Sequence, residues 1–420
     1  MKNVYDIRYE KDLTYIIPQT IDQSSIFLPG QIFTEAAIIL YLYYIDTLSN
    51  YWIYIDVIPK EIDIYIISSQ NEVIKQVQEH MKSSGRKRVF YIKKENRGRD
   101  ISALLVTGTD IIERYNYICF LHDKKEHNQE VKADTDLWIW NLWGNLIGSS
   151  YHIKYILRLF MENEELGILA PPEPIGDHFC TWYGFGWHNS FEITREIGKK
   201  MELSADISVD KPPITIGSVL WFKANALRKL FSVGWNYNDF DDSRLTDRNY
   251  LSYGIERIFA YVAQDAGYET GTVMTVEYAR KQISYIQYST RYLLSEAREF
   301  FPISSISDLE QYKKNVERMI AFASQSERLY LYGAGEQGKF CFSILKRSNL
   351  SPIGYLISGK QSISVVNSLP VYSLERVKSL AGCAIIITVL EEKNRKEIEE
   401  KLKARGFYNY IEFWSGLAEH

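Results

Sequence analysis

The sequence predicts an α/β protein in which a sheet flanked by helices forms a large first domain and a small Rossmann-like domain follows it. In the first domain, apolar segments of strand length alternate with segments of helical period, and charged residues follow two of the strands. In the second, a strand runs straight into a glycine-rich turn near residue 333 and then into a helix. The length of 420 residues also requires more than one hydrophobic core.

Alternation of strands and helices in the first domain is typical of parallel strand pairs joined by helices. Residues 1–34 show no strong period and are expected to form an N-terminal extension. Ala36–Leu48 fits either a buried strand or a buried helix. The other elements expected here are strands at Ile62–Ser68, Val89–Ile92, Tyr117–Leu121, Leu166–Ala170 and Ile214–Lys223, and helices at Asn71–Ser83, Tyr151–Asn163, Ser190–Met201, Ala224–Phe231 and Arg248–Gly267.

The C-terminal part begins after connecting helices that are expected between residues 280 and 325. Pro302 interrupts these helices, and Ser307-Asp308 can cap the second of them. The Rossmann-like domain is then expected to contain strands at Arg328–Tyr332, Ile353–Ile357, Ala384–Thr388 and Tyr408–Phe413, and helices at Lys339–Lys346 and Lys393–Arg405.

Composition excludes several classes of protein. The net charge of −4 argues against non-specific nucleic-acid binding, which needs a basic surface. The cysteines Cys119, Cys180, Cys341 and Cys383 are scattered, so they are expected to be reduced and buried. The longest apolar run, Ala36–Ile45, is about half of a membrane span. We therefore expect a cytoplasmic protein whose contact with the membrane is at most peripheral, at its inner face.

The first candidate binding segment is the polar turn Asn96-Arg97-Gly98-Arg99-Asp100, which follows the strand Val89–Ile92. Gly98 allows a tight turn, and Arg97 and Arg99 are suited to bidentate bonds with a diphosphate. Asp100 stands where a helix begins. The alternative is a solvated charged turn in which Asp100 caps the helix.

The second candidate segment is His122-Asp123-Lys124-Lys125, at the end of the strand Tyr117–Leu121. Carboxyl ends of parallel strands meet at one edge of a sheet, so this segment and the first are expected to face the same ligand. Asp123 is the one carboxylate available for a divalent cation, and Lys124 or Lys125 can neutralise a leaving diphosphate without a metal. A structural strand-end loop is the alternative.

We interpret the expected diphosphate-bearing ligand as a nucleotide sugar, and transfer of its sugar needs a carboxylate that removes the proton of the acceptor hydroxyl. Glu256, near the middle of a predicted helix, is the candidate, with Asp241 or Asp242 behind it. The alternative is an exposed glutamate paired with a nearby arginine.

A second nucleotide-type site is suggested by Gly333, Gly335 and Gly338, which form a GxGxxG pattern between a strand and a helix. The acidic ribose ligand expected at the end of the next strand is missing, since that strand ends at Ser358. A purely structural Rossmann unit therefore stays open beside an NAD site. Trp138, Trp140 and Trp143 are either part of an acceptor groove or core residues.

The ordered segments AAIILYLYY, IDIYIIS, ENRGRD, FLHDKK, LWIWNLWGNLIG, LGILAPP, ITIGSVLWFKANAL and YGIERIFAYVAQDAGY resemble the rhamnan synthesis protein F family over about residues 35–295. The resemblance implies a nucleotide-diphospho-sugar transferase (GT-A-like) fold for 35–295, followed by a helical linker at 296–325 and the Rossmann-like domain at 326–420. It puts Asn96–Asp100, His122, Lys124 and Lys125 at the donor. Glu256 and Arg257 match the family's Glu-Arg pair.

The family also implies rhamnosyl transfer from a nucleotide-diphospho-sugar, dTDP-rhamnose, to a glycan or lipid-linked acceptor in the synthesis of bacterial surface polysaccharide. The sequence lacks the usual second carboxylate of a metal site, which puts the metal in doubt. Two alternatives remain: a non-catalytic glycan- or nucleotide-binding assembly protein with a transferase-like fold, and an NAD-dependent sugar-nucleotide enzyme centred on Gly333–Gly338.

Overall fold

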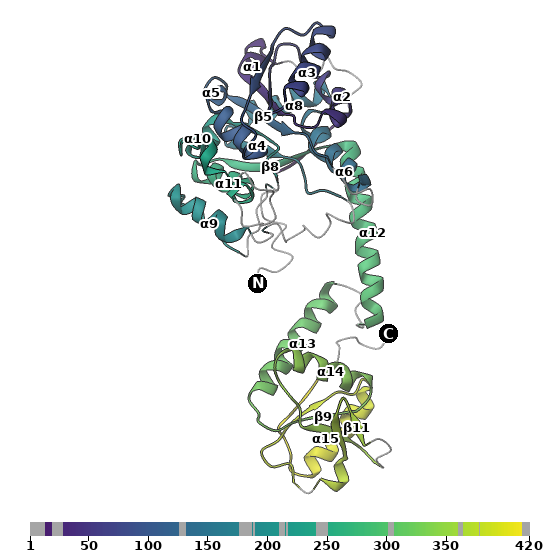
Figure 1. The fold of residues 1–420 in the computed structure, drawn as a ribbon. Coiled ribbons are helices and arrows are strands. Elements are labelled where there is room, and N and C mark those ends of the chain that lie inside the picture. Colours follow the sequence, from purple (N-terminus) through teal and green to yellow (C-terminus); the bar gives the residue numbers. More distant parts are fainter. Residues whose placement is uncertain are drawn as a thin grey trace. The chain divides into compact units, whose positions relative to one another are not determined.

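The computed structural model describes residues 13–18, 28–125, 132–175, 187, 190–209, 215, 217–240, 251–300, 306–359, 364–377 and 379–413. The chain divides into two compact units, Met1–Tyr285 and Ile286–His420 (Figure 1). Each unit contains its own sheet with helices packed on both faces. The predicted class is therefore confirmed: a large mixed α/β sheet and a second, smaller α/β sheet.

The sheet of the N-terminal unit has eight strands in the order β1-β8-β6-β7-β5-β2-β3-β4. The strand β7 pairs antiparallel with both β5 and β6, and the other pairs are parallel. Its strands are β1 Thr14–Ile17, β2 Ala36–Tyr41, β3 Asp63–Ser68, β4 Val89–Lys93, β5 Tyr117–His122, β6 Leu166–Ala170, β7 Leu220–Lys223 and β8 Glu269–Thr275.

One strand of this sheet settles an open choice, and two others differ from the sequence-based expectation. Ala36–Tyr41 is a strand, which resolves the choice between strand and helix, and its six residues are all buried. The predicted strand Ile214–Lys223 is shorter and runs antiparallel as β7. The strand β8 was not predicted; it lies between β1 and β6, so Thr14–Ile17 of the N-terminal segment is part of the sheet.

Helices cover both faces of this sheet because successive strand residues face opposite sides. On one side, Ile38 and Leu40 of β2 pack in one core with residues of α3 and α8. On the other side, Ala37 and Ile39 pack in a second core with residues of α4, α9, α10 and α11 (Figure 1). Fully buried strands of this kind read as continuous apolar runs.

The helices predicted at Asn71–Ser83, Tyr151–Asn163, Ser190–Met201, Ala224–Phe231 and Arg248–Gly267 are present, among further short helices. The helices of the N-terminal unit are α1 Gly30–Thr34, α2 Trp52–Ile55, α3 Asn71–Ser83, α4 Arg99–Ser102, α5 Thr109–Ile112, α6 Lys132–Ile139, α7 Asn145–Ile147, α8 Ser150–Glu162, α9 Phe191–Lys200, α10 Ala224–Phe231 and α11 Leu251–Asp265, with π-helical turns at Ala103–Thr107 and Trp140–Gly144 and 3-10 turns at Ile45–Tyr51 and Tyr237–Asp239. The helix α12 Val276–Phe300 begins in this unit and continues into the next.

The C-terminal unit has the strand order β11-β12-β10-β9-β13-β14. All pairs are parallel except β11 with β12. Its helices pack on both faces, and α13 contributes Met319 and Ala323 to one of the cores. The elements are α13 Ile306–Ser324, β9 Leu329–Tyr332, α14 Glu336–Arg347, β10 Gly354–Ile357, β11 Val365–Val366, β12 Leu369–Ser373, β13 Ala384–Ile387, α15 Glu392–Ala404 and β14 Tyr410–Glu412, with a 3-10 turn at Leu374–Arg376.

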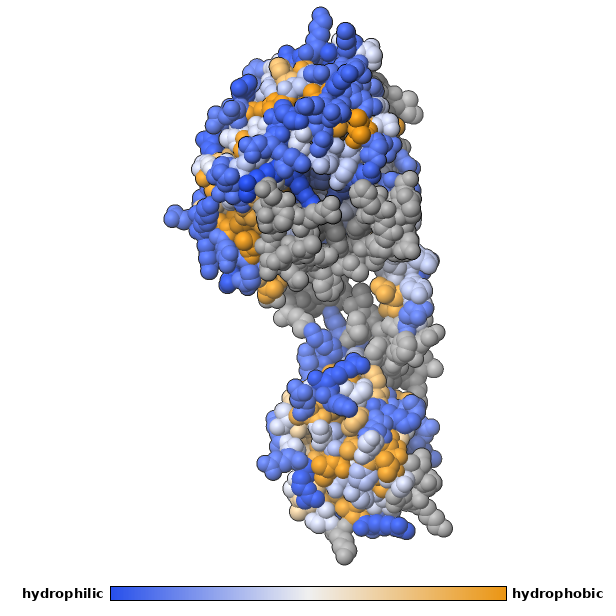
Figure 2. All heavy atoms as spheres, in the orientation of Figure 1, coloured by the Kyte–Doolittle hydropathy of each residue, from blue (hydrophilic) through white to orange (hydrophobic). Residues whose placement is uncertain are grey.

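Within the described residues, no helix is both long enough and apolar enough to cross a membrane. Figure 2 shows a described surface on which hydrophilic residues dominate in the N-terminal unit and apolar residues gather in separate small patches.

Candidate functional site

The site lies where four segments meet at one edge of the large sheet. The parallel strands β4 and β5 end at this edge, and the turn to α4 and His122 follow from them. Because β7 runs antiparallel to β5, its beginning lies at this same edge, which brings in Ser218. Glu256 comes from α11, which packs against α4. The structure thus brings together three segments that the sequence analysis singled out separately.

The turn between β4 and α4 is held by hydrogen bonds to its own carbonyl groups. The Lys94 ammonium group donates to Glu95 O at 2.7 Å and to Arg97 O at 3.0 Å, and the Ser102 hydroxyl also donates to Arg97 O. Burial lowers the pKa of Lys94 to about 8. Arg97 Nε donates to Phe240 O, so this arginine joins the turn to the segment before residue 241. That nitrogen serves the fold and is not presented to a diphosphate.

Gly98 lets the same turn pass close to Phe240. Its φ of 68° is left-handed, and a Cβ atom there would lie 2.7 Å from Phe240 Cγ. Arg99 also has a positive φ, of 49°, and its side chain is exposed. Asn96 is exposed too, and its Oδ1 accepts a bond of 3.1 Å from Ser69 Oγ. Of the two arginines in the turn, Arg99 is therefore the one open to a ligand.

Asp100 is the centre of the cluster. Its Oδ2 accepts a hydrogen bond from Ser218 Oγ and lies 3.8 Å from His122 Nε2. Burial alone would raise the pKa of Asp100, but His122, the Ser218 hydrogen bond and the charge of Lys124 together lower it. The carboxyl group is therefore ionised at neutral pH.

The hydrogen bonds of His122 determine its tautomer. Nδ1 lies 2.9 Å from Asp123 O, and because a carbonyl oxygen only accepts, Nδ1 carries the proton. Burial lowers the pKa of His122, although Asp100 raises it, so the ring is neutral at pH 7. Nε2 is then an acceptor that faces the acceptor Oδ2 of Asp100. A ligand hydroxyl at this edge can donate to either of these two acceptors.

Glu256 has the properties of a general base. Burial raises its pKa to about 7, with Asp100 acting in the same direction, while Arg257 and Lys124 lower it. Arg257 Nη1 donates to Glu256 Oε2 at 3.1 Å and to Tyr253 O at 3.1 Å. The guanidinium group is almost fully buried, and this bond positions the carboxylate. The exposed ion pair that was the alternative for Glu256 is therefore not what the structure contains.

The two lysines at the end of β5 have different surroundings. Lys124 Nζ lies 3.5 Å above the ring of Trp138, and its charge affects both Asp100 and Glu256. Lys125 Nζ forms an ion pair with Asp46. Lys124 is thus the lysine whose charge belongs to the cluster.

Asp123 is hydrogen-bonded to the backbone that follows the neighbouring strand β2. Its Oδ2 accepts hydrogen bonds from the backbone N–H groups of Tyr43, at 2.8 Å, and Tyr44, at 2.7 Å. Its Oδ1 is buried and has no hydrogen-bond partner. The described residues also contain no group of three or more His, Cys, Asp and Glu side chains arranged to hold a metal ion. Through the two bonds to Oδ2 the carboxylate links the end of β5 to the chain that follows β2.

Some predicted residues lie elsewhere. Asp241 and Asp242 fall outside the described residues. Trp143 is fully buried and donates from Nε1 to His122 O at 3.1 Å, so it belongs to the core and not to an acceptor groove. The glycines of the GxGxxG pattern are in the C-terminal unit.

Sequence reasoning did not single out Lys94 or, within the segment ITIGSVLWFKANAL, the individual residue Ser218. Nothing in the sequence distinguishes the buried Lys94 from the neighbouring Lys93, which is exposed. Ser218 follows Gly217, whose φ is 101°. A glycine directly before a strand was a usable signal for a residue placed by a tight backbone turn.

Comparison with known proteins identifies the family of the chain. No curated protein matches the chain. A family model described as rhamnan synthesis protein F matches residues 1–268, which include Asp100, His122, Ser218 and Glu256. The match begins at residue 1, whereas the resemblance in the sequence was placed from residue 35. Because it spans well over half of the 420 residues, the chain belongs to the rhamnan synthesis protein F family, and its role lies in the synthesis of this polysaccharide.

Proposed function

We propose that the protein is a glycosyltransferase that transfers a sugar from a nucleotide-diphosphate donor, dTDP-rhamnose in the first instance, to a glycan or lipid-linked acceptor. The observation that carries the proposal is the half-buried cluster of Asp100, His122 and Glu256 at the carboxyl edge of a transferase-like sheet. Family membership supports the setting, polysaccharide synthesis. A peripheral position at the membrane would suit a lipid-linked acceptor.

The transfer follows a direct displacement. The acceptor hydroxyl gives its proton to the Glu256 carboxylate while its oxygen forms a bond to the anomeric carbon of the donor. The bond from that carbon to the phosphate oxygen breaks, and the nucleoside diphosphate leaves with the electron pair. Lys124 and the exposed Arg99 are placed to offset the charge of the leaving group. His122 Nε2 and Asp100 Oδ2 accept from sugar hydroxyls and orient them.

The test is Glu256→Gln, measured as release of free nucleotide and as transfer of labelled sugar to a glycan acceptor. We expect kcat to fall at least ~100-fold, because a general base contributes about that much, while donor binding is retained. With a base pKa of about 7, the wild-type rate rises as the pH rises through 7, because the carboxylate form is the active one.

Glu192→Gln is the matched control. Glu192 is an exposed helical glutamate paired with Arg195, and its replacement is expected to leave the rate unchanged. Full activity in Glu256→Gln would remove Glu256 from the mechanism.

The hydrogen bonds that engage Asp123 Oδ2 favour a second candidate, a non-catalytic assembly protein that binds a glycan or a nucleotide. If the protein is of this kind, we expect measurable glycan binding and no nucleotide release from any donor in a panel of nucleotide sugars. Release from one donor would exclude it.

A further inference from the structure

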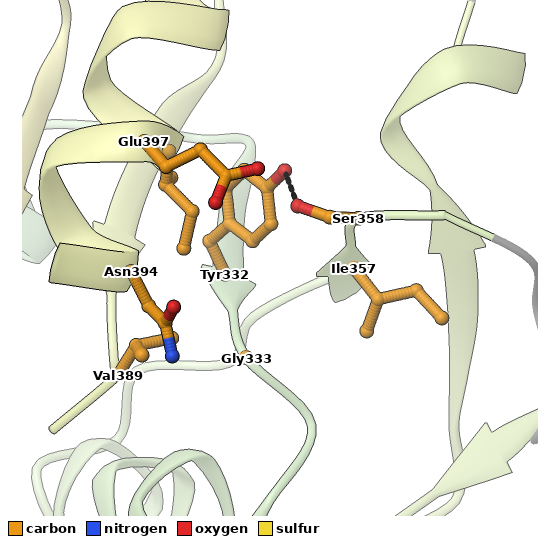
Figure 3. Close-up of a pocket in the computed structure, with 8 residues that line it drawn as sticks. Tyr332, Gly333, Ile357, Ser358, Val389, Asn394 and Glu397 are labelled. Atoms are coloured by element: carbon orange, nitrogen blue, oxygen red, sulfur yellow. Dashed lines mark hydrogen bonds between the residues drawn. The ribbon is translucent and has the colours of Figure 1, made fainter. Parts of the chain in front are cut away.

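The C-terminal unit contains a pocket at the carboxyl ends of its central strands. Its strand order places β9 between β10 and β13, so the connections after β9 and β13 leave in opposite directions. Such a switch point is where open α/β sheets bind ligands. The pocket there has a volume of about 250 Å³, and its lining includes Tyr332, Gly333, Ser358, Asn394 and Glu397 (Figure 3).

Two of the three motif glycines are explained by the fold itself. Gly333 has a φ of 122°, and a Cβ atom there would lie 2.9 Å from Thr388 Oγ1. A Cβ atom on Gly338 would lie 1.9 Å from Gly333 O, so helix α14 packs directly on the preceding turn. Neither position accepts a side chain.

Gly335 has no such explanation. Its φ is −79°, which any residue adopts, and no atom lies within 4 Å of the place that a Cβ would take. Neither conformation nor packing within the described chain requires glycine there. A glycine whose outer side is open in this way is what close approach of a ligand to the backbone requires.

The first turn of α14 is prepared for an anion. Gly335 is its N-cap and supplies no side-chain hydrogen bond, and the bond from Lys339 N to Gly335 O, 3.0 Å long, is the first of the helix. The N–H groups before Lys339 lack partners within the helix. The buried Nε2 of Gln337, in this same turn, also has no hydrogen-bond partner. Unpaired donors at a 12-residue helix favour a phosphate group.

The pocket itself, which reaches this turn at Gly333, is lined in part by hydroxyl and carboxylate groups. Tyr332 and Ser358 share a hydrogen bond of 2.9 Å between their hydroxyl groups, and Figure 3 shows the Glu397 carboxylate beside them. Glu397 is paired with Lys401 at 2.6 Å, and no lysine or arginine is among the lining residues. This lining suits the hydroxyl groups of a sugar and repels a second phosphate, such as the 2′-phosphate of NADP.

We propose that this pocket binds a nucleoside diphosphate, either free or as the nucleotide part of a sugar nucleotide or of NAD. The diphosphate lies on the first turn of α14, and the ribose faces Ser358 and Glu397. Glu397 then takes the place of the acidic residue that is missing at the end of β10. The site is separate from the cluster around Asp100 and does not depend on whether that cluster transfers a sugar.

The test compares the full-length protein with its Gly335→Asp variant by hydrogen exchange. Aspartate is a favourable N-cap, so the variant is expected to fold with an equal or higher thermal midpoint, while its charge repels phosphate. In the wild type, dTDP, UDP or ADP at 1 mM is expected to slow exchange in peptides that cover Gly333–Arg347. In the variant the protection is lost, with binding at least ~10-fold weaker. Parallel samples with dTDP-rhamnose and NAD identify the larger ligand.

Gly30→Asp is the matched control. Gly30 begins a helix in the other unit, also has open space at its Cβ position, and lacks a left-handed φ. This variant is expected to respond like the wild type. Two results would overturn the proposal: no slowing around α14 with any of these nucleotides, or equal slowing in Gly335→Asp and the wild type.

Discussion

At the scale of single residues, Asp123 shows that a carboxylate at a strand end can accept hydrogen bonds from the backbone of a neighbouring segment. In the sequence it is the one carboxylate at the end of an apolar strand, where transferases often bind a metal. In the structure His122 and Lys124 belong to the cluster, while the carboxylate between them accepts from the backbone of Tyr43 and Tyr44. The alternation of side chains at a strand end explains the difference. The Asp123 carboxylate thereby joins the end of β5 to the chain that follows β2.

Replacing Asp123 separates this structural role from a metal or donor role. Asp123→Asn keeps an oxygen for both N–H groups, so we expect transfer activity within about twofold of the wild type. Asp123→Ala leaves two buried donors unpaired and should lower the free energy of unfolding by about 2–5 kcal/mol. Urea unfolding and the transfer assay measure both effects. Loss of activity in a stably folded Asp123→Asn would contradict the structural role.

The pH dependence of stability predicts in which direction the difference between Asp123→Asn and the wild type changes. Burial raises the pKa of Asp123 to about 7 from an ordinary 3.8, so between these values the folded protein holds a proton that the unfolded chain has released. The contribution of this group to wild-type stability is therefore complete below about pH 4 and is lost as the pH rises through 7. Asp123→Asn lacks this loss, so its stability relative to the wild type should increase from pH 5 to pH 8.

At the scale of elements, the sequence predicted most helices and strands but not the direction of β7 or the existence of β8. Asn71–Ser83, Leu166–Ala170 and Ala224–Phe231 form the elements expected of them, because each has a clear period and clear end signals. Strand direction is a property of pairing between distant segments, and no local pattern contains it. The candidate site shares this limit. Its segments were visible in the sequence, but the contact of Ser218 with Asp100 depends on β7 being antiparallel.

The turn between β4 and α4 illustrates what a local pattern can and cannot provide. Gly98 predicted a tight turn, and the structure confirms a left-handed residue there. The approach of Phe240, 142 residues later in the chain, and the bonds from Lys94 are tertiary and were not predictable. This turn is therefore shaped partly by the segment that packs over it.

Gly98→Ala tests that packing. The φ of 68° alone should cost about 1 kcal/mol, and contacts of 2.7 Å with Phe240 Cγ and Ser102 Cβ add to this cost. We expect about 2–4 kcal/mol less stability and a marked loss of activity, because Arg99 and Asp100 would move. Gly85→Ala is the control, since Gly85 has the same φ of 68° with no atom within 4 Å. It should lose only the conformational part, and equal losses in both variants would show that packing at Gly98 is unimportant.

At the scale of the whole molecule, the chain length and the glycine-rich motif at Gly333–Gly338 were enough to predict more than one domain. The structure adds that each hydrophobic core draws its residues from one unit only. The predicted linker is not separate from these cores, because α13 buries Met319 and Ala323 in the C-terminal unit. Sequence period identified this helix, but the surface on which it packs is a tertiary property.

Because each unit has its own cores, a core substitution is expected to destabilise only the unit that contains it. Ile39 in β2 and Ile386 in β13 are both fully buried on central strands of their own sheets. Ile39→Ala and Ile386→Ala should each cost about 2–5 kcal/mol, because each leaves a cavity in a close-packed core. Because the two cores share no residue, we expect differential scanning calorimetry to resolve two transitions, each lowered by only one of the variants.

Ile386→Ala should also weaken nucleotide protection at α14 near its lowered transition, while Ile39→Ala should not. A single transition shifted equally by both variants would mean that the two units unfold as one cooperative body, and the C-terminal pocket could then not be treated as an independent binding site.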